Sequence, residues 1–240
     1  MVSAYVVSKT NSMKILTTLT AFLLTSILYS QTIDSLKTNK HNISITYSPD
    51  YCFRKLVANA SSEWVKEGLD TLEVGKLGYT AGLNYTFDFN KRFAISTGLL
   101  LSNKGEKTKK IFSSTPSVFN YNNHYYYLDI PLTARYNLLN KLFKLYAFGG
   151  ISSNIFLVEK TTQISGYTND DAKISYYNKQ NFSKVNFAIL AGFGIQYSLT
   201  KKWDLKIEPI YRRSINAIAN TPVKKYLYSF GINIGFSTSF

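Results

Sequence analysis

The segment from Tyr226 to Phe240 alternates between two kinds of residue. Apart from Thr238, one set of positions is apolar or aromatic, and it comprises Tyr226, Tyr228, Phe230, Ile232, Ile234, Phe236 and Phe240. After Leu227 the intervening positions hold only serine, glycine and asparagine. Because successive side chains of a strand point to opposite faces, this pattern predicts a strand with one apolar and one small, polar face. The apolar face suits lipid, and the polar face suits the interior of a narrow barrel.

The same alternation recurs along the chain and predicts seven further strands. Their ranges are 41–51, 75–89, 93–103, 125–138, 142–158, 185–199 and 203–213, of which 142–158 is the least regular. Tight turns at 90–92, 139–141 and 200–202 alternate with long polar connections at 52–74, 104–124, 159–184 and 214–225. Short turns at one end and long loops at the other are typical of outer-membrane barrels. The sequence therefore predicts an all-β fold, an eight-stranded, antiparallel up-and-down transmembrane β-barrel over residues 41–240.

The beginning of the chain has the features of an export signal. Its first thirty residues contain no acid, and a basic Met13–Lys14 start precedes an apolar run that closes with Ser30. This pattern predicts a signal peptide over residues 1–30, with Met13 as the expected true start, and a short periplasmic segment over 31–40. A mean hydropathy of −0.10 fits a barrel, since alternating strands average to neutral. We expect the protein in the bacterial outer membrane.

Charge indicates which partners to expect. The chain has 28 Lys and Arg against 14 Asp and Glu, but an exported barrel does not meet nucleic acid. We expect outer-membrane lipid and lipopolysaccharide, the barrel-assembly machinery and an unidentified protein partner. The expected assembly signal is the apolar face of the terminal strand, namely Tyr228, Phe230, Ile232, Ile234, Phe236 and Phe240. A basic external loop is expected to bind phosphates through Lys104, Lys107, Lys109 and Lys110.

Several charged residues occupy the polar faces of the predicted strands. They are Asp129, Arg135, Lys206, Glu208 and Arg212. Because buried charges require partners and an eight-stranded barrel is only wide enough for its own side chains, we expect a salt-bridge network that fills the lumen. A narrow polar pore is the alternative. Pro131 lies inside a predicted strand and lacks an N–H group, so we expect a bulge or local break there. The lone cysteine, Cys52, cannot form an intramolecular disulfide and is expected in a loop or at a strand end.

One segment resembles a known family. Leu128, Asp129, Ile130, Pro131 and Leu132, preceded by Tyr127 and followed by Arg135–Tyr136, resemble the "YLEIPLLLKY" motif of the PorT-like outer-membrane barrels of Bacteroidota. Gly98–Gly105 and the Ala191–Gly194 run are also similar to that family. The resemblance implies a cell-envelope location in the outer membrane and a proline at this motif position. One class of members assists a secretion system, and no catalytic residue transfers.

The sequence offers little catalytic chemistry. His41 and His124 are isolated, whereas a metal site needs clustered ligands, so neither metal nor cofactor is expected. A catalytic reading would join His124 to Ser113, Ser114 and Ser117. We predict a non-enzymatic structural or interaction protein with a filled lumen. The alternatives are a narrow porin-like channel, a lipid-modifying barrel enzyme, and a soluble lipocalin-like barrel with apolar residues inside.

Overall fold

A computed structural model describes residues 40–112, 118–140, 143–166, 171–200 and 202–240. The predicted signal peptide, its start at Met13 and nearly all of the segment 31–40 lie outside the described residues, as do Ser113, Ser114 and Ser117. The described strands form one antiparallel sheet in the order β4-β5-β3-β2-β1-β10-β9-β8-β6-β7, and β5 also pairs with β6. Their bounds are β1 (His41–Ala58), β2 (Glu73–Asp88), β3 (Phe93–Thr108), β4 (Ile111–Phe112), β5 (Val118–Asn140), β6 (Phe143–Gly166), β7 (Asp171–Asn178), β8 (Val185–Ser198), β9 (Trp203–Ser214) and β10 (Val223–Ser239).

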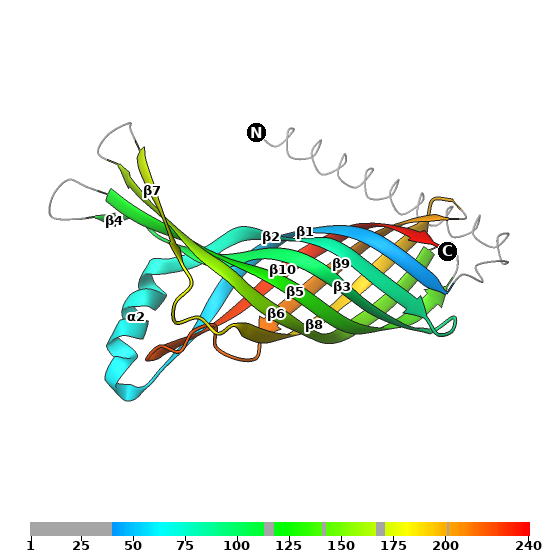
Figure 1. Cartoon of the computed structure of the whole chain (residues 1–240), viewed down its shortest axis with the longest axis horizontal. Coiled ribbons are helices and arrows are strands. Elements are labelled where there is room, and N and C mark those ends of the chain that lie inside the picture. The colour runs from blue at the N-terminus through cyan, green and yellow to red at the C-terminus, as the bar shows by residue number, and fades with distance from the viewer. Residues whose placement is uncertain (1–39, 113–117, 141–142, 167–170, 201) are drawn as a thin grey trace, which may run out of the picture.

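The β5–β6 pairing closes eight strands into a ring, and β4 and β7 are attached outside it. Figure 1 shows the resulting barrel, with β10 beside β1 and the C-terminus at one end. The barrel and its eight strands confirm the predicted fold class.

The two ends of the barrel differ. At the end that holds the C-terminus, connections are tight: Asn90 Oδ1 accepts from the backbone N–H groups of Arg92 and Phe93, and Thr200 Oγ1 accepts from that of Trp203. The other end carries β4, β7, a 3₁₀ turn η2 (Ala60–Ser62) and the helix α2 (Glu63–Leu72) (Figure 1). Short turns mark the periplasmic end of such barrels, so α2, β4 and β7 lie on the extracellular side.

The faces of the strands are polar inside and apolar outside. In β1 the side chains of Asn42, Ser44 and Thr46 are buried, whereas those of Ile43 and Ile45 are exposed. A soluble carrier needs the opposite arrangement, so the lipocalin-like alternative is wrong. Among the described residues, no helix is both long enough and apolar enough to cross a membrane.

Several predicted connections were wrong. The segments 52–74, 104–124 and 159–184 were expected to be long polar loops, but β1, β3, β5 and β6 continue into them and α2 occupies residues 63–72. Beyond the lipid both faces of a strand meet water, so alternation is no longer required and polar sequence continues the strands.

Two single-residue expectations also change. No bulge occurs at Pro131: the β3–β5 pairing passes from Thr97–Leu132 to Leu100–Asp129 in unchanged register, with the pairs between them skipped. The expected local break is therefore present, because proline cannot donate to the neighbouring strand. Cys52 lies within β1 with its side chain buried, and its predicted position in a loop or at a strand end was wrong.

Candidate functional site

The lumen contains ion pairs between strands. Arg212 Nη1 lies 2.7 Å from Asp50 Oδ1, and Arg135 Nη2 lies 2.7 Å from Asp88 Oδ1. Lys104 Nζ lies 2.9 Å from Asp129 Oδ2. These side chains are buried except that of Asp88, which is 20% exposed. The pairing satisfies charges that would be costly to bury alone.

The five predicted lumen charges do face the interior, but they do not pair with one another. Three of them, Asp129, Arg135 and Arg212, bind partners outside the predicted set of five. Glu208 accepts hydrogen bonds from Tyr146 Oη at 2.6 Å and from Asn233 Nδ2 at 3.0 Å. Lys206 is buried and lines the central cavity. A salt-bridge network exists, but its partners come from strands far apart in sequence.

Lys104 corrects the prediction of a basic external loop. It was expected outside the barrel with Lys107, Lys109 and Lys110, but β3 continues to Thr108 and Lys104 points into the lumen. Its ammonium group also lies 5.2 Å from the centroid of the Tyr127 ring. Strand alternation places Lys104 on the same face as Ser102, which is buried, whereas Lys107 is exposed.

A cavity of about 70 Å³ lies in the middle of the barrel. Charged residues in its lining include Lys104, Asp129, Arg135, Lys206 and Arg212. This volume holds roughly five water molecules. The cavity is therefore a small, partly charged chamber with room for ordered water.

Below the chamber, on the periplasmic side, Tyr146 fills the lumen. Its ring crosses Gly194, where an added Cβ would lie 2.3 Å from a ring carbon. The Arg135 guanidinium lies 4.8 Å from the centroid of the same ring. Glycine at position 194 is thus what leaves space for the aromatic ring inside a narrow barrel.

Above the chamber, an apolar cluster closes the extracellular end, and we call it the apolar plug. Its members are Tyr125, Tyr127, Ile218 and Leu227, with Phe156, Phe182 and Ala219 packed against them. The Phe156 and Phe182 rings stack with centroids 4.5 Å apart. Phe182 and Ile218 belong to the connections before β8 and after β9, so these connections fold over the barrel mouth. Apolar burial at this position is unfavourable for water in the opening.

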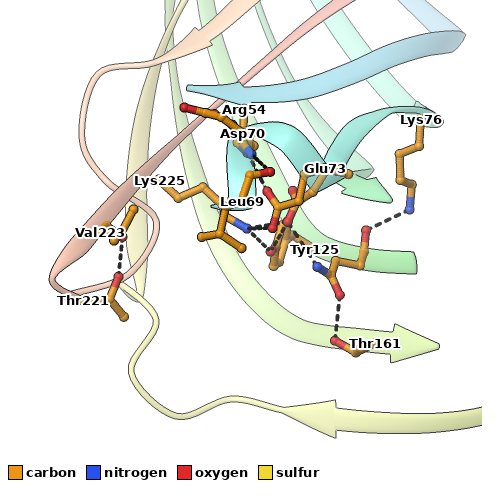
Figure 2. Close-up of polar contacts among 12 residues, drawn as sticks. Arg54, Leu69, Asp70, Glu73, Lys76, Tyr125, Thr161, Thr221, Val223 and Lys225 are labelled. Carbon is orange, nitrogen blue, oxygen red and sulfur yellow. Dashed lines mark hydrogen bonds and ion pairs between the residues drawn. The ribbon is translucent and has the colours of Figure 1, made fainter. Parts of the chain in front are cut away.

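A polar network joins α2 and the start of β2 to β1 (Figure 2). Arg54 donates to Glu73 at 2.5 Å and to the Leu69 carbonyl at 2.9 Å, and it also contacts Asp70. Burial opposes the charge of Arg54, but its hydrogen bonds with Glu73 and Asp70 outweigh this and raise its pKa.

A second part of the network joins β10 to β3 and β5. Lys225 pairs with the buried Glu106, and its ammonium lies 3.6 Å from Glu73. Tyr125 Oη donates to Glu106 at 2.9 Å. Sequence reading missed this network. The signal that could have revealed it is the charge spacing of α2. Lys66 lies three residues after Glu63 and four before Asp70, which is the spacing of ion pairs on a helix.

The two histidines lie on different strands and have separate partners. His41 Nδ1 lies 2.6 Å from Tyr85 Oη. His124 Nδ1 lies 2.6 Å from Lys76 Nζ and 3.1 Å from Asn103 Oδ1. Within the described parts of the chain, no group of three His, Cys, Asp or Glu side chains is arranged to hold a metal ion.

Comparison with known proteins identifies the family. Residues 42–220 match the family model described as "Outer membrane protein beta-barrel domain". The chain belongs to this family. No curated protein matches it. The family and the lipid-facing exterior confirm the predicted location in the bacterial outer membrane.

Several solved barrels are similar in structure. Neisserial surface protein A is 11% identical, with a TM-score of 0.47, and the match covers 84% of this chain and 97% of that one. OprG from Pseudomonas aeruginosa is 13% identical, with a TM-score of 0.44 and coverage of 84% and 96%. Ail from Yersinia pestis is 11% identical, with a TM-score of 0.39 and coverage of 83% and 98%.

Proposed function

We propose that this family member is a closed, non-enzymatic barrel that serves as a structural or interaction protein of the cell envelope. The observation that carries the proposal is the apolar plug over the central chamber. A conducting barrel needs a continuous polar path, and the plug interrupts that path at the extracellular end. Tyr146 fills the lumen on the other side of the chamber.

The extracellular end supports a role in interaction. Trp64 on α2 is 75% exposed, and Tyr176 and Tyr177 on β7 are 54% and 68% exposed. In Figure 1 β7 projects away from the barrel beside the end of β6. Exposed aromatic residues are enriched at protein interfaces, so this end is where we expect a protein partner.

The resemblance to the PorT-like barrels of Bacteroidota gives a finer proposal. Its motif, Leu128 to Leu132, lies within β5, and Asp129 of the motif forms the ion pair with Lys104. By this resemblance, the protein assists a surface or secretion machinery. The terminal segment from Tyr228 to Phe240 falls almost wholly in β10, which pairs with β1 to close the barrel. This placement supports its proposed role as the barrel-assembly signal.

Conductance in planar lipid bilayers tests the proposal. The folded protein should give no reproducible unitary step, with a known porin as the positive control and heat-unfolded protein as the negative one. Reproducible steps would instead support the narrow porin-like channel. The enzyme alternative has its own test: lipid A from cells that express the chain should have the same mass profile for the native protein and for His124→Ala. A product lost in the variant would show a lipid-modifying activity and end the proposal.

A further inference from the structure

The strand β7 has an unpaired edge outside the barrel (Figure 1). It stands last in the strand order and, among the described residues, pairs only with the end of β6, where Asn178 is opposite Glu159 and Asp171 is opposite Gly166. In an antiparallel pair only every second residue bonds to its neighbour, so the N–H and C=O groups of the other residues point away from β6. In the part of the chain that the structure describes, no other backbone segment bonds to them. The outer edge of β7 can therefore pair with one more strand.

This edge lacks most of the features that keep exposed edges from pairing. Protected edges are usually very short, bulged, or interrupted by proline or by charges. β7 has eight residues, contains no proline, and pairs with β6 without a register shift. At the other end of the strand order, β4 has only two residues. β7 is thus long and regular enough to act as a template for an added strand.

The two faces of β7 differ in chemistry. Strand alternation gives it an apolar face, which holds Ala172, Ile174 and Tyr176. The other face, which we call the lysine face, holds Lys173, Ser175 and Tyr177. All these side chains are exposed, whereas those of the neighbouring β6 residues 159–166 are half-buried. A strand added at the edge would therefore contact an apolar row on one side and a polar, cationic row on the other.

Charge indicates which strand would fit. On the lysine face, Lys160 of β6 stands opposite Tyr177, and its ammonium lies 5.8 Å from the centroid of that ring. Among the described residues, Lys173 forms no ion pair with a carboxylate. Glu159 falls on the apolar face, where Asn178 donates to it at 3.3 Å. Opposite charges on adjacent strands stabilise their pairing, and the chain as a whole has 28 Lys and Arg against 14 Asp and Glu, so an acidic segment is favoured.

We propose that β7 binds an extended segment of a partner protein, which joins the sheet as a further strand and alternates acidic with apolar residues. The backbone of that segment would bond to the outer edge of β7. Its acidic side chains would lie beside Lys173 on the lysine face, and its apolar side chains beside Ile174 and Tyr176. This binding mode rests on the proposed role in interaction and adds the mode of contact and the chemistry of the partner.

Fluorescence anisotropy of a labelled, end-capped peptide with the full barrel in detergent tests the proposal. The probe has the length of β7 and alternates glutamate with valine. A peptide of the same charge with proline in place of valine should bind at least about tenfold more weakly, because proline cannot donate to the ladder. Lys173→Glu should weaken the acidic probe about fivefold and tighten a lysine–valine peptide by a similar factor. Lys202→Glu is the matched control, since Lys202 is exposed at the periplasmic end.

Hydrogen exchange of the native protein gives a second measurement that needs no variant. The acidic probe should slow amide exchange in β7, because the outward N–H groups become bonded, and should leave β8 to β10 unchanged. Equal binding of the proline peptide, an acidic probe that does not bind, or protection outside β7 would each overturn the proposal. A barrel that binds no added strand and still gives no conductance step would overturn strand addition alone and leave the closed lumen standing.

Discussion

Removing the Asp50 carboxylate tests whether the lumen network holds the barrel together. Asp50 is fully buried and accepts hydrogen bonds from Ser48 at 2.6 Å, from Thr80 at 2.5 Å and from Arg212 at 2.7 Å. Asp50→Asn keeps the shape of the side chain but leaves Arg212 as a buried cation without its counter-charge. Breaking a buried ion pair in this way costs about 3–5 kcal/mol. The folding equilibrium constant should therefore fall roughly a hundred- to several-thousand-fold.

Urea titration of the barrel folded into phospholipid vesicles measures this change, with heat-dependent migration on SDS gels reporting the folded fraction. Glu63→Gln is the control, because the Glu63–Lys66 ion pair on α2 is exposed, with side chains 45% and 26% exposed, and its loss should cost at most about 1 kcal/mol. The Asp50→Asn/Arg212→Met double variant should be less destabilised than the sum of the two single variants, by about 0.5–3 kcal/mol. A loss at Asp50 no larger than that at Glu63, or strict additivity, would refute the reasoning.

Three further substitutions test other parts of the lumen by the same titration. Gly194→Ala should prevent formation of the fast-migrating barrel, because its Cβ would meet the Tyr146 ring. Gly149→Ala is the control and should fold, because the nearest atom to its Cβ would be 3.5 Å away. Equal behaviour of the two variants would contradict the packing argument. Ile218→Ala should cost about 2–5 kcal/mol through a cavity in the apolar plug, and a neutral result would mean that the plug is loosely packed. Lys104→Met should cost about 3–5 kcal/mol because it strands a buried carboxylate, whereas a surface lysine can be replaced at almost no cost.

The barrel was predictable because lipid on one side and a polar lumen on the other require apolar and polar residues to alternate along each strand. The run from Leu77 to Phe89 shows this: every odd position is apolar, and every even position is small or polar. The same logic predicted that Asp129 and Arg135 face inward. This alternation is required only where a strand contacts lipid. The extension of β5 and β6 beyond the membrane and the position of Lys104 were therefore not predicted.

The helix α2 had a readable but weaker signal. Its sequence places Glu63 in the first turn, and Lys66 pairs with both Glu63 and Asp70 at helical spacing. The long polar connection around it favoured a loop reading. The apolar plug had no such signal, because Phe182 and Ile218 are single apolar residues in polar segments and gain their role only when the two connections meet over the barrel.

Interior pairing follows a pattern that reading strands one at a time does not reveal. Arg212 on β9 reaches Asp50 on β1 across β10, where Gly231 is the residue opposite Asp50 and an added Cβ would lie 1.8 Å from its carboxylate. Arg135 on β5 reaches Asp88 on β2 across β3, where Ala94 lies opposite both.

Lys76 on β2 likewise lies 2.6 Å from His124 on β5, and the β3 residue opposite His124 is Gly105. In each case a small residue on the middle strand lets two long side chains meet above it. A charge opposite a glycine or alanine on the neighbouring strand is therefore best paired with a partner two strands away. Applied with the strand register, this rule pairs Asp50 with Arg212 and Asp88 with Arg135, which the pattern of single strands could not do.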